Sequence, residues 1–151
     1  SQIEPKLEQQ KRLAKCNELS ECIVSGDFWI NNILFHKNHS KCALIDFQWF
    51  SKGHVLDDVL FFLYTSCNKQ QLVNGGEEAL LLFYFDTINA MYYNKYKVDL
   101  DKQAFKEDLH HQRMYAFRKM VASVDIFKEP LKKQPTVIRD RLQFALDAIL
   151  K

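Results

Sequence analysis

Glycine is scarce in this chain of 151 residues, which contains only Gly26, Gly53, Gly75 and Gly76. Their spacing excludes a G-x-G-x-x-G loop, the glycine-rich turn with which many proteins cover a phosphate group. No apolar run approaches the roughly 20 residues of a membrane-spanning helix, and the acidic, glutamine-rich start lacks the layout of a signal peptide. The sequence therefore predicts a cytoplasmic protein without a membrane span.

Neither sign of charge is in large excess, since 21 Lys and Arg residues face 19 Asp and Glu residues and leave a net charge of +2. Nucleic-acid-binding domains need clustered basic residues, so this balance predicts no nucleic-acid partner. The four cysteines contain no C-x-x-C pair and are expected to be reduced thiols. His36, His39 and Cys42 lack a fourth zinc ligand, and His54 has no partner pattern, so no structural metal site is predicted.

The length and the hydrophobic content of 47% are enough for one domain with a single core, which we place over residues 1–151. The apolar periodicity predicts a mainly helical chain. The expected helices cover residues 4–18, a buried segment beginning near 57, residues 77–94, a segment from a cap at Asp99 or Asp101 to about 124, and residues 136–150.

Two of these helices have apolar faces that can be named from the sequence. For the helix over 77–94, the predicted inward residues are Leu80, Leu81, Phe83, Tyr84, Ile88 and Met91. Its many aromatic residues either line an apolar substrate pocket or belong to the core, and both interpretations stay open. For the last helix, the predicted inward residues are Ile138, Leu142, Leu146, Ile149 and Leu150.

Short strands are predicted in the first third of the chain. Residues 22–24 read as a buried strand that leads into Gly26, where the missing side chain permits a tight bend. The apolar runs 33–35 and 43–45 enclose the polar stretch 36–41, which is typical of a hairpin with a solvated tip.

Three residues with oxygen-bearing side chains surround this hairpin. Asp27 precedes Asn32 by five positions, and Asp46 follows the second apolar run. An Asp and an Asn five apart on one loop, followed by a second Asp after a short hairpin, have the order found in kinase active sites. Such an Asp orients the attacking hydroxyl, while the amide and the second carboxylate hold Mg²⁺. We therefore expect the three side chains to converge around a shared cavity at the mouth of the hairpin.

Residues 25–58 resemble the ecdysteroid kinase-like family, also called CHK kinase-like, which is related to choline kinases and aminoglycoside phosphotransferases. The family pattern reads H-G-D-x-W-x-N-N-I-L-F, then I-D-F-Q, then a Gly and an Asp that opens an apolar helix. This chain matches from Gly26 to Phe35, again over 45–48, and at Gly53 and Asp58. It departs at Ser25, which stands where the family has a histidine that supports the loop.

The resemblance implies an α+β, mainly helical fold: the C-terminal lobe of a protein-kinase-like fold, with a small β-hairpin on the active face. No V-A-I-K-like lysine precedes the motif, so the N-terminal lobe is expected to be absent from this chain. The implied function is phosphorylation of a hydroxyl on a small lipophilic, ecdysteroid-like molecule, with ATP and Mg²⁺ as cofactors. Asp27 would be the catalytic base, and Asn32 and Asp46 the magnesium ligands and the cofactor-binding residues.

A small-molecule acceptor is favoured because the A-P-E sequence and the long activation segment of protein kinases are missing after Asp46. Asp58 either ties its helix to the catalytic loop, as in the family, or only caps that helix. Two other functions stay open. Ser25 and the missing lobe favour a truncated or degenerate non-catalytic paralogue, and a helical interaction domain with a chance motif is the third interpretation.

Overall fold

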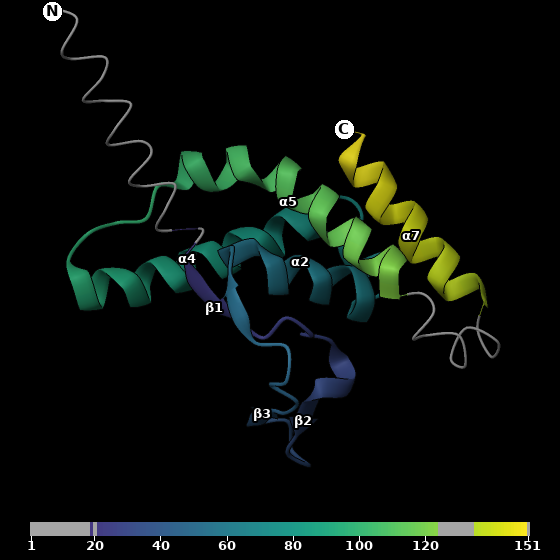
Figure 1. The fold of residues 1–151 in the computed structure, drawn as a ribbon, viewed down its shortest axis with the longest axis horizontal. Helices are drawn as coiled ribbons and strands as arrows, with labels where there is room; N and C mark the ends of the chain where they lie inside the picture. The colour runs from purple at the N-terminus through teal and green to yellow at the C-terminus, as the bar shows by residue number, and fades with distance from the viewer. Residues whose placement is uncertain (1–18, 20, 124–134, 151) are drawn as a thin grey trace, which may run out of the picture.

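The computed structural model describes residue 19, residues 21–123 and residues 135–150. The helix predicted over 4–18 lies outside these residues. Figure 1 shows the helices stacked on one side and the small strands β2 and β3 projecting below them. The elements are β1 (Cys22–Val24), a 3₁₀ turn η1 (Ile30–Asn32), β2 (Ile33–Phe35), β3 (Cys42–Leu44), β4 (Ser51–Gly53), α2 (Val55–Ser66), α3 (Lys69–Leu72), α4 (Gly76–Tyr96), α5 (Lys102–Ser123) and α7 (Pro135–Ile149).

Helix α2 is the centre of the core, as its apolar sequence predicts. Among its buried residues, Leu56, Leu60 and Phe61 are almost wholly hidden from solvent. The helix begins at Val55, two residues before the predicted start, because His54 caps it: the His54 Nδ1 atom accepts a hydrogen bond from the Leu56 amide at 3.1 Å. His54, for which the sequence shows no metal-binding partner pattern, is therefore a helix cap in the structure.

Helix α4 exposes much of the face that periodicity assigned to the core. Leu81 and Phe85 are buried, and the Phe85 ring packs 4.9 Å from that of Phe105. In contrast, Phe83 is 72% exposed and Met91 is 68% exposed, so their predicted inward position is wrong. The neighbouring helices cover only a narrow side of α4, and apolar content alone does not show which side that is.

The ends of the two remaining long helices are set by local chemistry. Asp101 caps α5, since its Oδ1 atom accepts hydrogen bonds from the Gln103 amide at 2.9 Å and the Ala104 amide at 3.0 Å. Ile149 is buried at the end of α7, whereas Leu150 is 75% exposed because it follows the last helical residue. The predicted inward position of Leu150 is therefore wrong. No helix among the described residues is long and apolar enough to cross a membrane.

The strands form two separate two-stranded antiparallel sheets. Strand β2 pairs with β3, with Ile33 opposite Leu44, which confirms the predicted hairpin. Its second strand begins and ends one residue earlier than the predicted run 43–45. Strand β1 pairs with β4, a partner 27 positions along the chain, with Val24 opposite Ser51. The rest of the molecule covers only one face of this two-stranded sheet. Ile23 is therefore 82% exposed, and the prediction of a buried strand is wrong at this residue.

A largely buried polar group joins three helices. Glu77 of α4 accepts hydrogen bonds from the hydroxyl of Tyr64 in α2 at 2.8 Å and from Nε of Arg113 in α5 at 3.2 Å. Burial, followed by the nearby Glu77 charge, raises the pKa of Tyr64 well above its usual range. The Glu77 carboxylate has little access to water, so Tyr64 and Arg113 must replace the hydrogen bonds that water would otherwise donate to it.

Replacing Arg113 with methionine should destabilise the protein by about 3 kcal/mol, because the Glu77 carboxylate would remain buried with a single partner. A matched control is Lys102→Met, which removes a cation from the exposed pair with Asp86. That control should change stability by less than about 1 kcal/mol. Urea denaturation measures both variants, and equal losses would contradict the importance of the buried pair.

Candidate active site

The loop that carries Asp27 is brought to its place by the pairing of β1 with β4. Because Val24 lies opposite Ser51 in antiparallel register, residues 25–27 and 48–50 meet at the same end of this sheet. Gly26 has a φ of 77°, and a Cβ atom there would collide with the carbonyl oxygen of Trp49. Glycine is therefore required at this position by both its conformation and the close approach.

Asp27 and Asn32 are in direct contact. The Asn32 Nδ2 atom donates to the Asp27 backbone oxygen at 2.8 Å and to its Oδ2 atom at 3.0 Å. The turn η1 explains the spacing of five residues because it folds the chain back. Within it, the backbone amide of Asn32 donates to the Trp29 carbonyl at 3.0 Å. Ser66 of α2 anchors this turn by accepting a hydrogen bond from the Ile30 amide at 2.9 Å.

The segment with Asp46 is attached to the same loop. The Ile45 amide donates to the Asn32 carbonyl at 3.0 Å, which places Asp46 one residue away from a direct contact with Asn32. Asp46 itself is exposed and has a φ of 61°. Residues other than glycine adopt this left-handed backbone conformation at an energetic cost, and residues strained in this way are concentrated at functional positions.

The side-chain oxygens of Asn32 and Asp46 are donor atoms of the kind that binds a magnesium ion. Both hydrogen bonds of Asn32 to Asp27 use the amide nitrogen, so its oxygen is directed away from Asp27. An amide oxygen and the carboxylate of Asp46 are the hard ligands that Mg²⁺ prefers. Among the described residues, no group of three or more His, Cys, Asp and Glu side chains gathers as a metal site. A site here would therefore take further oxygens from a phosphate or water.

Asp58 connects helix α2 to the loop, which decides between the two interpretations of this residue. Its Oδ2 atom accepts a hydrogen bond from the Ser25 amide at 2.6 Å, and its Oδ1 atom accepts one from the Gly26 amide at 3.1 Å. Asp57, and not Asp58, completes the cap with His54, since its Oδ2 atom accepts a hydrogen bond from the His54 amide at 2.9 Å. The carboxylate of Asp58 therefore holds the two residues that precede Asp27.

Aromatic residues next to Asp27 fasten the loop to the core. The ring of Phe28 lies 5.1 Å from that of Phe62 in α2. Trp29 packs against the buried core and also lines a cavity next to Asp27. The sequence alone leaves open whether Trp29 is a core residue or a residue of the catalytic loop, and in the structure its indole is large enough to serve both surfaces.

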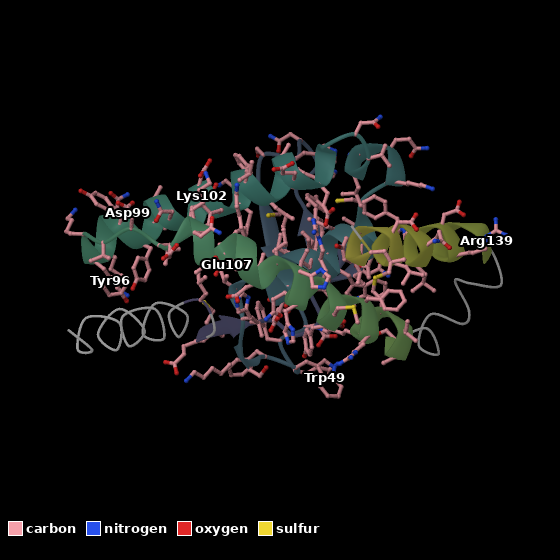
Figure 2. All side chains as sticks on the ribbon, turned by 90° about the horizontal axis from the view of Figure 1, so that it is seen from above. Trp49, Tyr96, Asp99, Lys102, Glu107 and Arg139 are labelled. Carbon is pink, nitrogen blue, oxygen red and sulfur yellow. The ribbon has the colours of Figure 1, made fainter. Side chains whose placement is uncertain are left out.

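Asp27 lines a cavity of about 340 Å³ between the loop, the segment 49–52 and helix α5. Figure 2 shows Trp49 at the edge of the molecule, beside the C-terminal half of α5. The other lining residues include Tyr115, Lys119 and Ser123 of α5. Asn32 and Asp46 are not among the lining residues of this cavity, so the convergence of all three motif residues around one cavity stays a prediction.

Lys119 is a cavity residue that the sequence reasoning missed. Burial lowers its pKa, while the charges of Asp58, Asp27 and Asp57 act in the opposite direction. Asp57 in turn has a raised pKa, because its burial outweighs the hydrogen bond and the positive charges near it. No local signal marks Lys119, since it is one of several lysines on a helix 92 positions after Asp27 in the chain.

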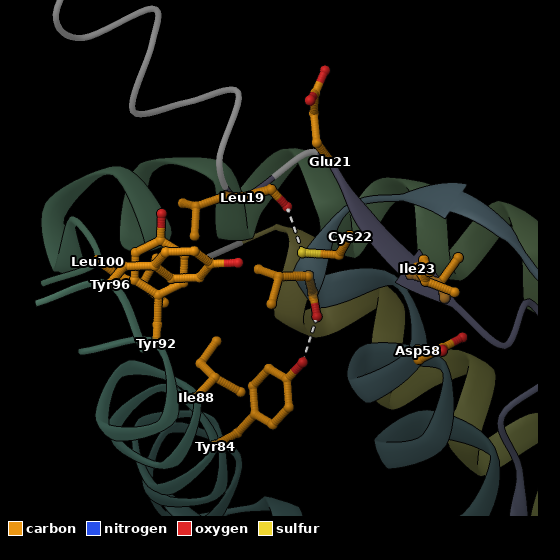
Figure 3. Close-up of a pocket in the computed structure, with 12 residues that line it drawn as sticks. Leu19, Glu21, Cys22, Ile23, Asp58, Tyr84, Ile88, Tyr92, Tyr96 and Leu100 are labelled. Carbon is orange, nitrogen blue, oxygen red and sulfur yellow. Dashed lines mark hydrogen bonds between the residues drawn. The ribbon is translucent and has the colours of Figure 1, made fainter. Parts of the chain in front are cut away.

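A second cavity, of about 390 Å³, lies on another side of β1. Figure 3 shows tyrosines of α4 facing Cys22 across it, with the Tyr84 hydroxyl donating to the Val55 carbonyl at 2.8 Å. Burial, followed by the charges of Cys22 and Asp58, raises the pKa of Tyr84 to about 12. The aromatic residues of α4 thus divide between this cavity, the core at Phe85 and the solvent at Phe83, and a substrate pocket formed by them stays a prediction.

The fold and the loop geometry define the class of protein. A mainly helical α+β unit that carries an Asp and an Asn on one loop, beside a hairpin leading to a second Asp, has the order of kinase-like proteins. The sequence model of the ecdysteroid kinase-like family matches residues 6–97, which is more than half of the chain. The chain belongs to this family, whose membership implies a kinase-like fold. Comparisons with curated proteins and with solved structures gave no match.

Replacing Asp58 with alanine should release the loop, because the amides of Ser25 and Gly26 would lose their acceptor. We expect a loss of about 2 kcal/mol in stability and hydrogen exchange about tenfold faster or more at these two amides. Asp101→Ala is the matched control, since it also removes a carboxylate that accepts two backbone hydrogen bonds, but at α5. Unchanged exchange at Ser25 and Gly26 in Asp58→Ala would show that the loop is held by other contacts.

Proposed function

We propose that this chain carries the catalytic and magnesium-binding side of an ATP-dependent phosphotransferase that acts on a hydroxyl of a small lipophilic, ecdysteroid-like molecule. The observation that supports the proposal most is the contact between Asp27 and Asn32, in a loop to which the Asp46 segment is hydrogen-bonded. Membership of the ecdysteroid kinase-like family points to a small-molecule kinase in general terms. The substrate and the activity itself belong to the proposal.

In this proposal, Asp27 accepts or orients the proton of the attacking hydroxyl. One hydrogen bond from the Asn32 side chain restricts the Asp27 carboxylate and a second holds the Asp27 backbone oxygen, so the carboxylate is oriented before the acceptor arrives. Asn32 and Asp46 would hold Mg²⁺, which supplies positive charge for the phosphate oxygens during transfer. Phosphoryl transfer requires mainly positioning and electrostatic stabilisation from the protein, and a rigid loop provides the first of these.

The acceptor would enter the cavity that Asp27 lines. Its volume of about 340 Å³ lies in the range of small-molecule sites, and Trp49 and Tyr115 give it aromatic walls. No residues in the sequence correspond to the peptide-docking segment of protein kinases, which agrees with a small-molecule acceptor.

The nucleotide would need a second wall. We propose that this wall packs against the hairpin, where apolar side chains are exposed and are not covered by any other described residues. An exposed apolar patch of this kind is typical of a docking surface. The exposed residues are Leu34, Phe35, Leu44, Ile45, Phe47, Trp49 and Phe50. The sequence also predicts Ile3, Leu7 and Leu13 as part of this exposed strip, but these three lie outside the residues that the structure describes.

Two substitutions separate the proposed roles in the complete natural protein. Asp27→Asn should leave nucleotide affinity nearly unchanged and lower turnover by about 10²–10⁴-fold, because the group that assists the hydroxyl is lost. Asp46→Ala should instead remove magnesium-dependent nucleotide binding, since it deletes a charged ligand. Steady-state kinetics and calorimetry with MgATP measure the two effects, and normal turnover in Asp27→Asn would disprove the role of Asp27.

Residues 1–151 in isolation should neither bind MgATP tightly nor hydrolyse it. Two carboxylates and an amide attract Mg²⁺, but the triphosphate would remain hydrated without donors on the other side of the cleft. Calorimetry and an ATPase assay on the purified chain test this expectation. Micromolar affinity or clear turnover by a monomer would show that these residues complete the nucleotide site themselves.

The alternative function is that of a non-catalytic binding module, and Ser25 is the observation that favours it. A serine replaces the family histidine directly beside Gly26 and Asp27, and its backbone amide is held by Asp58. Nucleotide binding without turnover in the complete protein would support this alternative.

A further inference from the structure

Lys119 lies on the wall of the Asp27 cavity and is held there by the core. Ala116, one turn before it, and Met120, the next residue, are buried, which fixes this stretch of α5 against the rest of the molecule. The Lys119 ammonium sits 4.5 Å from the centre of the Phe61 ring in α2. A cation at this distance from an aromatic face is attracted to it, so the position of the ammonium is restricted.

The negative charges of three carboxylates, those of Asp58, Asp27 and Asp57, act on the same ammonium. Two of them already have structural tasks, since Asp57 binds the His54 amide and Asp58 binds the loop amides. Asp27 and Lys119 line one cavity, and no direct ion pair joins these two described residues. An ammonium carries three donors and no acceptor, whereas a carboxylate only accepts hydrogen bonds. The cavity therefore presents both kinds of group to a ligand.

We propose that Lys119 is an acceptor-binding residue, which donates a hydrogen bond to a second oxygen of the molecule whose hydroxyl Asp27 orients. This inference rests on the proposed phosphotransferase function and adds a substrate class to it. The preferred acceptor has two neighbouring oxygens, such as a vicinal diol, on an apolar ring. One oxygen faces Asp27 and the other faces Lys119, while the ring contacts Trp49 and Tyr115. Lys119 lies beyond residues 6–97, so the match to the family does not cover it.

A pair of acceptors tests this inference in the complete natural protein. The probes are a steroid with two neighbouring ring hydroxyls and the same steroid with one of them removed. The native protein should have a kcat/KM for the diol about tenfold or more above that for the mono-alcohol, because a hydrogen bond from a charged donor is lost with the second oxygen. Lys119→Met should abolish this preference, mainly through a higher KM for the diol.

Lys52→Met is the matched control. Lys52 lines the same cavity, but it pairs with Glu21 at 2.8 Å and its side chain is 64% exposed. Removing its charge should leave the ratio between the two acceptors unchanged. Equal preference for both acceptors in the native protein, or an equal loss for both in Lys119→Met, would overturn the proposal.

A structural role for Lys119 gives a different result. If the lysine only balances the three carboxylates, Lys119→Met lowers stability and the activities on both steroids together. Lys119→Arg keeps the positive charge and is the deciding variant if Lys119→Met does not fold. Its different donor geometry should reduce the diol preference about threefold or more at native stability. An unchanged preference in Lys119→Arg would then overturn the proposal.

Equilibrium binding separates this inference from the phosphotransferase function. Both steroids can be titrated without ATP while tryptophan fluorescence is followed, since Trp29 and Trp49 line the cavity. If the native protein phosphorylates neither steroid but binds the diol more tightly, and Lys119→Met loses the difference, the proposed function fails and the role of Lys119 stands. Equal binding of the two steroids, or no binding of either, would overturn that role.

Discussion

The carboxylate of Asp58 binds the amides of Ser25 and Gly26 and so connects the most buried helix of the molecule to the loop with Asp27. Residues 33 and 32 positions apart are joined by these bonds, whereas the sheet of β1 and β4 contributes only three residue pairs. Phe28 and Trp29 fasten the part of the loop after Asp27 to the core, whereas the Asp58 carboxylate holds the two amides that precede Asp27. The geometry of Asp27 and Asn32 thus depends on a charge placed in the first turn of α2, where the helix dipole also favours it.

Several acidic groups gather at this point, and the molecule divides their tasks. Asp57 caps α2, Asp58 holds the loop, and Asp27 faces the cavity. Carboxylates so close to one another repel, and the ammonium of Lys119 offsets this repulsion from the opposite wall. The cation that balances the carboxylates also lines the cavity, so this role is compatible with the ligand contact that we propose for it.

Much of the fold was predictable, because the strongest patterns in the chain are local. The continuous apolar run after Asp58 gave a buried helix, and the two apolar runs around a polar stretch gave the hairpin. The failures concern exposure. Phe83 and Met91 are apolar residues of α4, and their exposure depends on how much of that helix its neighbours cover, whereas Leu150 follows the end of α7. The helix α3 is missing from the prediction for another reason, since its four residues are too few to show a periodic pattern.

The sequence by itself determined which residues have the chemistry of the site, since the spacing of Asp27, Asn32 and Asp46 can be read along the chain. It also determined the turn at Gly26, because glycine alone suits that conformation. Only the tertiary structure decided the task of Asp58, the contact of the His54 Nε2 atom with the Asp108 carboxylate at 3.2 Å, and the place of Lys119. Each of these depends on contacts between segments that lie 32 to 92 positions apart in the chain, and packing of helices, rather than any local preference, brings such segments together.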